Sequence, residues 1–259
     1  RDWSSDVCSS DLIFEETLIN PIKLTELHGM EPLYRTGQVR WYKKPSKGNV
    51  YVVALDPSLG TGGDPAAIQV FEANTTTQIA EWKHNKTTVP EQVKILADIV
   101  KHIHDVTEKP EEIYYSVENN TIGEAALISI EQYGEENIKG YFLSDRTVVS
   151  SGGRRYRKGF NTTNRSKLTA CSKLKTVVES GKMKINSMPL ISELKTFVAN
   201  GITFKAKVGQ HDDLVASLLL SIRMMMILQD WDPSIYEKMR DHTGLEEHDL
   251  PMPIYISTY

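Results

Sequence analysis

The chain lacks several features that mark common protein classes. Its 259 residues contain only 2 cysteines, Cys8 and Cys171, and these lack the close spacing of a metal site. We therefore expect no disulfide framework, and we expect the chain to occupy a reducing compartment. No apolar stretch is long enough to cross a bilayer, because the run at residues 214–228 is broken by two serines and by Arg223. We interpret that run as a helix buried on most sides, and we expect no membrane partner.

An excess of positive charge is also missing. The formal net charge is −4 at pH 7, so any contact with nucleic acid must come from a local basic patch. A phosphate-binding loop of the form GxxxxGK[ST] is absent, because SSGGRRYRKG lacks its spacing and GTGG lacks its lysine. We therefore expect no ATP site in this chain. The composition, 40% hydrophobic and 25% charged, suits one large globular domain with appendages.

Residues 1–12, RDWSSDVCSSDL, show no apolar period and look like the in-frame translation of a sequencing adapter. They lack the basic start and the apolar core of a signal peptide. We interpret them as a non-native leader and expect the chain to be truncated at its N-terminal side. The alternative is a genuine polar leader without fixed structure.

The remaining residues divide into three parts by pattern. Residues 13–48 mix turn signals with short amphipathic pieces, which indicates a linker or the remnant of a preceding domain. Residues 49–230 alternate short apolar runs with helical periods, which predicts one α/β domain with a mixed five-stranded sheet and helices on both faces. Residues 231–259 are polar and contain prolines, so we expect a tail there.

Short β-branched runs predict the strands of that sheet. They cover residues 51–56, 66–71, 77–82, 113–118 and 138–143, with a further strand at 202–205. Helices are predicted from Pro90, over residues 121–133, 167–179 and 190–199, and from Asp212. The first three strands should form an antiparallel meander, and the fourth should lie beside the first.

Acidic residues stand at the ends of three of these elements. Asp56 ends the first strand, Glu118 ends the fourth, and Asp212 and Asp213 open the last helix. Open α/β sheets bind their ligands at the carboxyl ends of the strands. Carboxylates that converge there repel one another unless a hard cation neutralises them. Two Mg²⁺ ions about 4 Å apart, bridged by one carboxylate, are the known arrangement for phosphodiester cleavage.

Each acid has a simpler explanation when it is taken alone. Asp56 precedes Pro57 and can begin a turn, Glu118 can cap the helix that follows, and Asp212 or Asp213 can cap the last helix. Together these explanations require three unrelated coincidences at element ends. We therefore prefer the metal site.

The segments VVALDPSLGTGGD, YYSVENN and GQHDDLVASLLLS follow the order and spacing of three acidic motifs. In these segments the sequence resembles the nuclease domain of the large terminase subunit of tailed bacteriophages, over about residues 42–228. The resemblance implies an RNase H-like fold with Asp56, Glu118 and Asp213 as the catalytic and metal-binding triad. It leaves Asp212 as a fourth ligand or a helix cap. We interpret Asp64, in GGD, as a turn residue or an outer residue of the site rather than a ligand.

The same resemblance implies a function. The chain would be an endonuclease that cuts concatemeric double-stranded DNA during viral genome packaging, with Mg²⁺ or Mn²⁺, two ions in all, as cofactor. Its partners would be double-stranded DNA, the portal protein and the small terminase subunit, in the cytoplasm of the host cell. The family usually carries an ATPase motor before the nuclease, so residues 13–48 become the end of that motor and its linker.

A basic segment stands out in this acidic chain. Residues 151–184 contain ten Lys and Arg residues against one acid, Glu179, and they include Tyr156 and Phe160. A run of charge is usually only a solvated face. This one suits sequence-independent contact with phosphates better. The residues predicted to contact DNA are Arg154, Arg155, Arg157, Lys158, Arg165 and Lys167.

Three alternatives remain at this point. Another RNase H-like nuclease, such as a Holliday-junction resolvase or an integrase, would use the same triad on a different DNA shape. An actin-like ATPase fold also ends its first strand in Asp, but it needs a second glycine-rich loop and a second domain. A non-catalytic DNA-binding module would leave the acidic triad unexplained.

Overall fold

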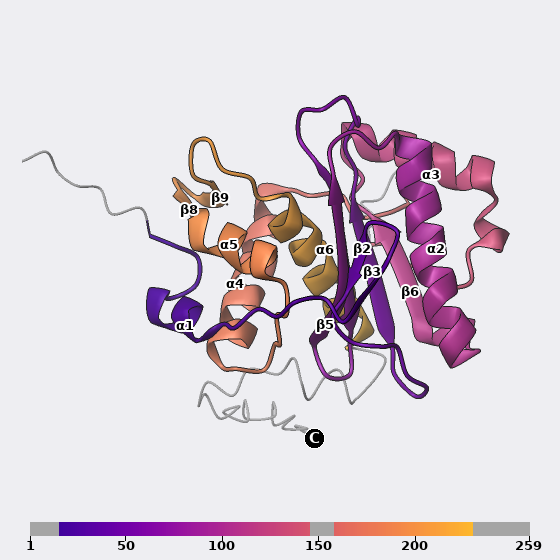
Figure 1. The fold of residues 1–259 in the computed structure, drawn as a ribbon. Helices are drawn as coiled ribbons and strands as arrows, with labels where there is room; N and C mark the ends of the chain where they lie inside the picture. The colour runs from indigo at the N-terminus through magenta and orange to yellow at the C-terminus, as the bar shows by residue number, and fades with distance from the viewer. Residues whose placement is uncertain (1–15, 146–157, 230–259) are drawn as a thin grey trace, which may run out of the picture.

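The computed structural model describes residues 16–145 and 158–229, which form three layers around one central sheet (Figure 1). The leader predicted at residues 1–12 and the tail predicted at residues 231–259 lie outside the described residues. Within the described part of the chain, no helix combines the length and the apolar character that a membrane span requires.

A seven-stranded mixed sheet forms the middle layer, in the order β1-β2-β5-β4-β3-β6-β7. Its strands are β1 (Tyr34–Thr36), β2 (Val39–Trp41), β3 (Tyr51–Asp56), β4 (Ala66–Glu72), β5 (Thr77–His84), β6 (Ile113–Val117) and β7 (Tyr141–Phe142). β3, β4 and β5 form an antiparallel meander, while β6 lies parallel to β3 and to β7. The predicted meander and the predicted neighbourhood of the first and fourth strands are confirmed.

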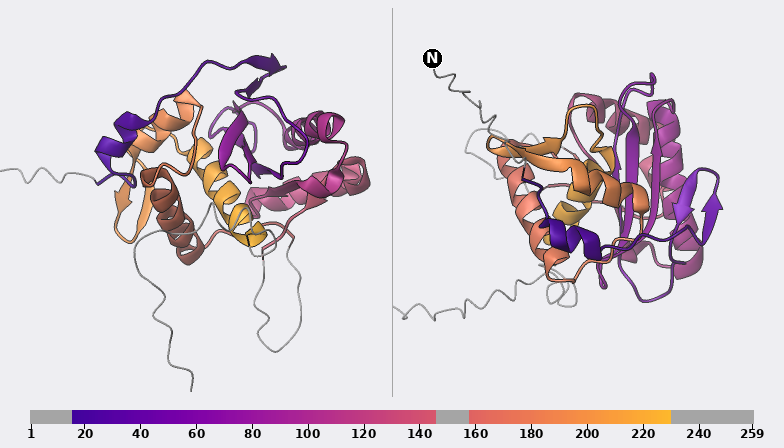
Figure 2. Two further views of the ribbon diagram at one scale, coloured as in Figure 1. Left: turned by 90° about the horizontal axis from the view of Figure 1, so that it is seen from below. Right: turned by 60° about the vertical axis from the view of Figure 1, so that its left-hand side comes forward.

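The prediction of five strands was wrong, because the segment interpreted as a linker supplies two more. β1 and β2 turn at Gly37, whose φ of 58° favours glycine, and β2 pairs with β5 at the edge of the sheet (Figure 2). Strands of 3 residues are too short for an alternation pattern to stand out in the sequence. The assignment of residues 13–48 to a preceding domain stays a prediction.

The strand predicted at residues 138–143 is only two residues long. Residues 135–137 form a short 3-10 helix, and the Gly140 N–H then donates to the Ile138 carbonyl at 2.8 Å. This tight turn leaves Tyr141 and Phe142 to pair with β6.

Helices cover both faces of the sheet. α2 (Val89–Thr107) and α3 (Thr121–Tyr133) lie on one face, and α4 (Asn164–Glu179), α5 (Met188–Thr196) and α6 (Asp213–Leu228) lie on the other (Figure 1). α4 begins three residues earlier than predicted because Thr163 and Ser166 form a capping box before its apolar face starts.

The helix predicted over residues 190–199 was too long. α5 ends at Thr196, and the chain continues as β8 (Phe197–Asn200), which pairs with β9 (Thr203–Ala206) in a separate hairpin. The turn lies at Gly201, with a φ of 58°. The short helix α1 (Pro21–Glu26) packs beside α5 on the side of the molecule away from the large sheet (Figure 2).

The central strand β3 joins two cores. Its side chains alternate, so Val52 and Ala54 pack with α4, α5 and α6, while Val53 and Leu55 pack with α2 and α3. Burial of a Val or Leu side chain stabilises a fold by about 1.5–3 kcal/mol. β3 is therefore a rigid support for the residue at its end, Asp56.

Candidate active site

The carboxyl ends of β3 and β6 bring two of the predicted acids together. Asp56 is the last residue of β3, and Glu118 directly follows β6. The Glu118 N–H donates to the Leu55 carbonyl at 3.0 Å, which continues the parallel pairing by one residue. The two side chains lie close enough together for Glu118 to raise the pKa of Asp56.

The backbone at Glu118 is held from both sides. Phe160 forms an isolated bridge with Glu118. On the other side, a Cβ on Gly123 would lie 2.0 Å from the Glu118 carbonyl oxygen, so glycine allows α3 to start close to this strand end. Asn120 caps α3 by accepting from the N–H groups of Ile122 and Gly123. The alternative explanation of Glu118 as the cap of α3 was therefore wrong.

The start of α6 is capped by a residue from another helix. Glu193 of α5 accepts hydrogen bonds from the N–H groups of Leu214 at 2.9 Å and Val215 at 3.2 Å, both through Oε2. Asp212 occupies the N-cap position, but its side chain makes no bond to α6 and accepts from the Ala206 N–H at 3.1 Å instead. The alternative explanation of Asp212 as a helix cap was thus wrong.

Asp213, the first residue of α6, lies beside a lysine. Lys83 Nζ lies 3.0 Å from Asp213 Oδ2 and 2.6 Å from Glu193 Oε1. The contact with Asp213 is an ion pair without hydrogen-bond geometry, since Oδ2 is buried and accepts no hydrogen bond from the described residues. His211 is further away, with its Nδ1 3.6 Å from Oδ2 and its side chain 58% exposed.

A hydrogen bond between α6 and β3 fixes the position of Asp213 relative to Asp56. Ser217, one turn further along α6, donates to the Ala54 carbonyl at 2.8 Å. Ala54 lies two residues before Asp56 on the same strand. The start of α6 is therefore held over the carboxyl end of β3.

Repulsion between the acids is strongest at Asp56. Burial raises the pKa of Asp56 well above its usual value, the charge and hydrogen bond of Glu118 raise it further, and the charges of Asp213 and Asp212 add to this. Burial alone would lower the pKa of Lys83, but the hydrogen bond and charge of Glu193 outweigh it and leave the pKa raised. The lysine is therefore a cation at neutral pH.

The four acids lie together but do not surround a common point. Among the residues that the structure describes, no three His, Cys, Asp or Glu side chains are arranged to hold a metal ion as they stand. Asp56 lies beside Glu118, Asp212 accepts a hydrogen bond from the Ala206 N–H, and Asp213 pairs with Lys83. A bound cation would have to replace some of these contacts.

The predicted DNA contacts are only partly placed. Arg154, Arg155 and Arg157 lie outside the described residues. Lys158 pairs with Glu135 at 2.6 Å, and Arg165 is exposed on the first turn of α4. Lys167 lines a small hollow of about 50 Å³ together with Glu118. The structure therefore places Lys167 beside Glu118, whereas the ammonium of Lys158 pairs with Glu135.

Sequence reasoning missed three charged residues around the cluster. Lys83 and Glu193 come from a mixed strand and a short helix, and Arg223 lies in the apolar run of α6. Glu193 and Arg223 could have been recognised from the sequence, because each is a charged residue among apolar neighbours in a predicted helix. Asp64 lies exposed in the turn before β4.

Arg223 binds described residues on both sides of residues 146–157. It bonds Asp145 at 2.6 Å, the Asn161 carbonyl at 3.0 Å and Thr162 Oγ1 at 3.2 Å. Its guanidinium also lies 5.0 Å from the centre of the Phe160 ring. Asp145, Asn161 and Thr162 are thereby held against α6.

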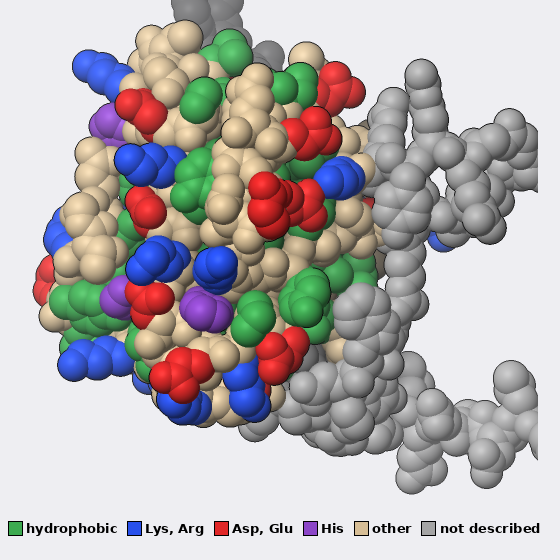
Figure 3. Space-filling view, turned by 90° about the vertical axis from the view of Figure 1, so that its right-hand side faces the viewer, with side chains coloured by type: hydrophobic (Ala, Val, Ile, Leu, Met, Phe, Trp, Pro, Cys, Tyr) green, Lys and Arg blue, Asp and Glu red, His purple; other side chains and the backbone are tan. Residues whose placement is uncertain are grey.

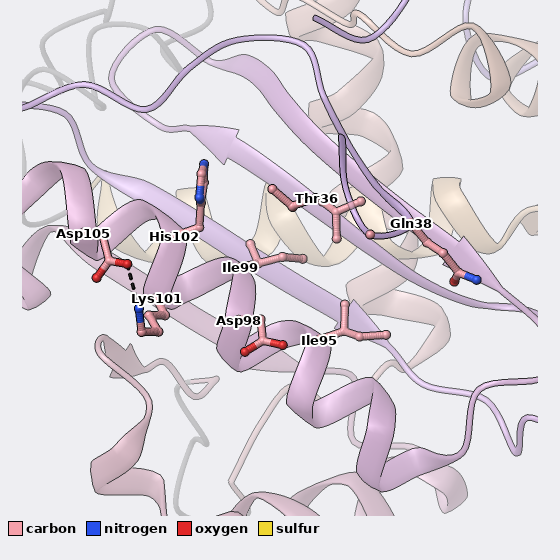
Figure 4. A pocket seen from close by; sticks show the side chains of 10 residues that line it. Thr36, Gln38, Ile95, Asp98, Ile99, Lys101, His102 and Asp105 are labelled. Carbon is pink, nitrogen blue, oxygen red and sulfur yellow. Dashed lines mark hydrogen bonds and ion pairs between the residues drawn. The ribbon is translucent and has the colours of Figure 1, made fainter. Parts of the chain in front are cut away.

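One further hollow is lined by none of the predicted site residues. A hollow of about 470 Å³ lies between the β1–β2 hairpin and α2, where Thr36 and Gln38 face Ile95 and His102 (Figure 4). On the side of the molecule that carries α2 and α3, described Lys, Arg, Asp and Glu side chains are interspersed (Figure 3). That face therefore offers no continuous basic surface.

Comparison with known proteins gives one family and a set of similar structures. Residues 53–225 match the family model described as the terminase RNaseH-like domain. The large terminase nuclease of the thermophilic phage G20c with bound magnesium is 19% identical, with a TM-score of 0.58 over 80% of this chain and 96% of that chain. The nuclease domain of the large terminase of Thermus phage P74-26 is 18% identical, with a TM-score of 0.54 over 76% and 90%.

A viral enzyme of a different host shares the fold. The human cytomegalovirus terminase nuclease domain, manganese-soaked and inhibitor-bound, is 16% identical, with a TM-score of 0.52 over 82% of this chain and 94% of that chain. At such identities the likeness shows the fold alone. The predicted RNase H-like class is confirmed.

Proposed function

Because the chain belongs to the terminase RNase H-like domain family, we propose that it is the nuclease of a viral genome-packaging terminase and cuts concatemeric double-stranded DNA. The observation that carries the proposal is the meeting of Asp56, Glu118 and Asp213 at one end of the sheet, with Asp212 near enough to raise the pKa of Asp56. Each ionised carboxylate in such a cluster makes ionisation of its neighbours less favourable. Without a bound cation, the clustered negative charges destabilise the folded chain.

The residues fit a hard divalent cation. All four acids offer carboxylate oxygens, which suit Mg²⁺ and Mn²⁺ better than softer metals. The Asp213 Oδ2 atom is buried and is paired with the Lys83 ammonium at 3.0 Å, so a metal ion that bound this oxygen would take the place of the lysine. Asp56, Glu118 and Asp213 would hold the ions, two in number, with Asp212 as a fourth ligand. When bound, such ions acidify a water molecule and stabilise the leaving oxygen of a phosphodiester.

The remaining residues position the DNA and the acids. Phe160 and the start of α3 hold the backbone of Glu118, and the bond from Ser217 to β3 holds the start of α6, so the backbone that carries the acids needs little reorganisation. Arg165 and Lys167 at the start of α4 offer cations to phosphates beside the cluster. The basic segment before them extends this contact without reading bases.

Partners and location follow from the same proposal. The portal protein and the small terminase subunit would bring the nuclease to DNA, in the cytoplasm of the host cell. Binding of either protein by the purified chain can be measured directly. Failure to bind would confine the proposal to the cleavage step.

A cleavage assay tests the function. The chain should cut linear duplex DNA with Mg²⁺ or Mn²⁺, and both a chelator and the substitution Asp56→Asn should stop it. Cleavage that persists in both would contradict the proposed site. A four-way junction offered in the same assay distinguishes the resolvase alternative, which predicts that the junction is cut in preference to the duplex.

A further inference from the structure

Lys83 is a buried cation within the acidic cluster. Its residue in β5 is in register with Ala67 of β4, and Ala67 is in register with Asp56 of β3. The lysine and the aspartate therefore lie at the same end of the sheet, on two strands that are separated by β4. The Lys83 side chain is only 19% exposed, so its ammonium is directed into the cluster rather than into solvent.

The two partners of Lys83 are held differently. Glu193 uses Oε1 for the lysine at 2.6 Å and Oε2 for the start of α6, so it stays in place whatever happens at the metal site. Asp213 contacts the lysine at 3.0 Å through an oxygen that accepts no hydrogen bond from the described residues. The contact with Glu193 is therefore the permanent one, and the contact with Asp213 is replaceable.

We propose that Lys83 is a resident counter-ion for Asp213, which it releases when a divalent cation binds while it stays paired with Glu193. The proposal rests on the proposed function, because the cation is the one held by the proposed site. In the metal-free chain, Lys83 offsets the repulsion between the acids and keeps Asp213 oriented. Since it competes for the same carboxylate, Lys83 lowers the affinity of the site for divalent cations.

A purely structural ion pair makes a different prediction. If Lys83 only joins β5 to α5 and α6, its removal destabilises the chain and leaves cation affinity unchanged or weaker. If Lys83 competes, its removal destabilises the metal-free chain but tightens cation binding. The two measurements together therefore separate the two roles.

Lys43 offers a matched control. It pairs with Glu72 at 2.7 Å, and the Glu72 side chain is 1% exposed, so this is also a lysine paired with a buried acid of the sheet. Glu72 is the last residue of β4, at the opposite end from the acidic cluster. Lys43→Gln removes a comparable ion pair far from the proposed site.

The experiment uses the whole chain without DNA. Mn²⁺ and Mg²⁺ are titrated calorimetrically into the wild type, Lys83→Gln, Lys83→Arg and Lys43→Gln, and thermal unfolding is followed in chelator. We expect Lys83→Gln to bind the cations about tenfold more tightly, since a unit charge within about 4 Å has a large effect even at high effective dielectric. Lys83→Arg should restore wild-type affinity, and Lys43→Gln should not change it. In chelator, Lys83→Gln should unfold at a lower temperature than the wild type.

Two results would overturn the proposal, and they have different meanings. If the wild type binds Mn²⁺ and Lys83→Gln binds it equally or more weakly, Lys83 does not compete, and the proposed function stands. If the wild type binds neither cation, the metal site and the counter-ion proposal both fail. Circular dichroism of each variant before titration confirms that the chain is folded.

Discussion

Replacement of Glu193 by alanine should destabilise the chain far more than removal of an ordinary surface acid. Glu193 is 8% exposed and accepts from two buried N–H groups at the start of α6, those of Leu214 and Val215. It also holds Lys83 at 2.6 Å. Substitution by alanine removes the partner of both N–H groups, and it leaves Lys83 paired with Asp213 but no longer with Glu193.

The structure sets the size of the effect. Hydrogen bonds to a charged group contribute about 1.5–3 kcal/mol each, and loss of a helix N-cap costs about 1 kcal/mol. Because Asp212 and Asp213 are partly exposed and water can reach the start of α6 through them, we expect a net loss of about 3 kcal/mol for Glu193→Ala. For a domain of roughly this size that lowers the melting temperature by about 6–12 °C. Glu193→Gln keeps an acceptor oxygen and should lose about half as much.

Thermal and urea unfolding in chelator measure this loss. The control is Glu26→Ala, which removes an exposed acid that pairs with Lys23 at 2.8 Å, and such pairs contribute about 0–1 kcal/mol. A Glu193→Ala chain no less stable than Glu26→Ala would refute the account of α6 given above. It would mean that water satisfies the start of the helix as well as Glu193 does.

Three further predictions concern the site and its DNA. Asp56→Asn and Asp213→Asn should each abolish cleavage while filter binding of DNA survives, and Asp212→Asn should do less; full activity of either of the first two removes that residue from the triad. The raised pKa of Asp56 means that the folded chain loses stability as pH rises above the unfolded value of 3.8. In chelator, Asp56→Asn should thus be more stable than the wild type near pH 8, with a gap that closes toward about pH 4; a constant gap would contradict the cause given for the shift. Alanine at four basic positions should weaken binding to all DNA sequences alike and flatten the salt slope by about 0.9 per lost phosphate contact, whereas an unchanged slope would mean that the segment is charged only for solubility. Those positions are Arg154, Arg155, Arg157 and Lys158.

Local signals decided which parts of the fold were predictable. α3 was predicted to the residue, at 121–133, because Asn120 caps it and Gly134 ends it. β2 was missed because it is only 3 residues long and joins the sheet by pairing with β5, about forty residues later, and no local pattern reveals such a partner. The end of α5 was missed because Phe197 and Val198 continue an apolar period that their pairing with β9 and with residues 16–18 overrides.

The same distinction applies to the site. The acids could be predicted because each stands at the end of an element whose direction was known, so their side of the sheet followed. Lys83 and Glu193 could not be paired from the sequence, since they are 110 positions apart and come from elements with no predicted contact. Asp212 and Asp213 were indistinguishable until the structure gave each a different partner, Ala206 and Lys83.

The hydrogen bond from Ser217 to Ala54 spans 163 positions, and this separation has a consequence for synthesis. β3 leaves the ribosome before α6, and this helix, which covers one face of β3 and brings Asp213, is made only after every other described element. Until α6 docks, the apolar surface around Ala54 and Phe71 stays open and the acidic cluster is incomplete. A nascent chain stopped before residue 213 would therefore have neither a closed core nor the full set of acids. Under the proposed function, a chain made in this order cuts DNA only after α6 has docked.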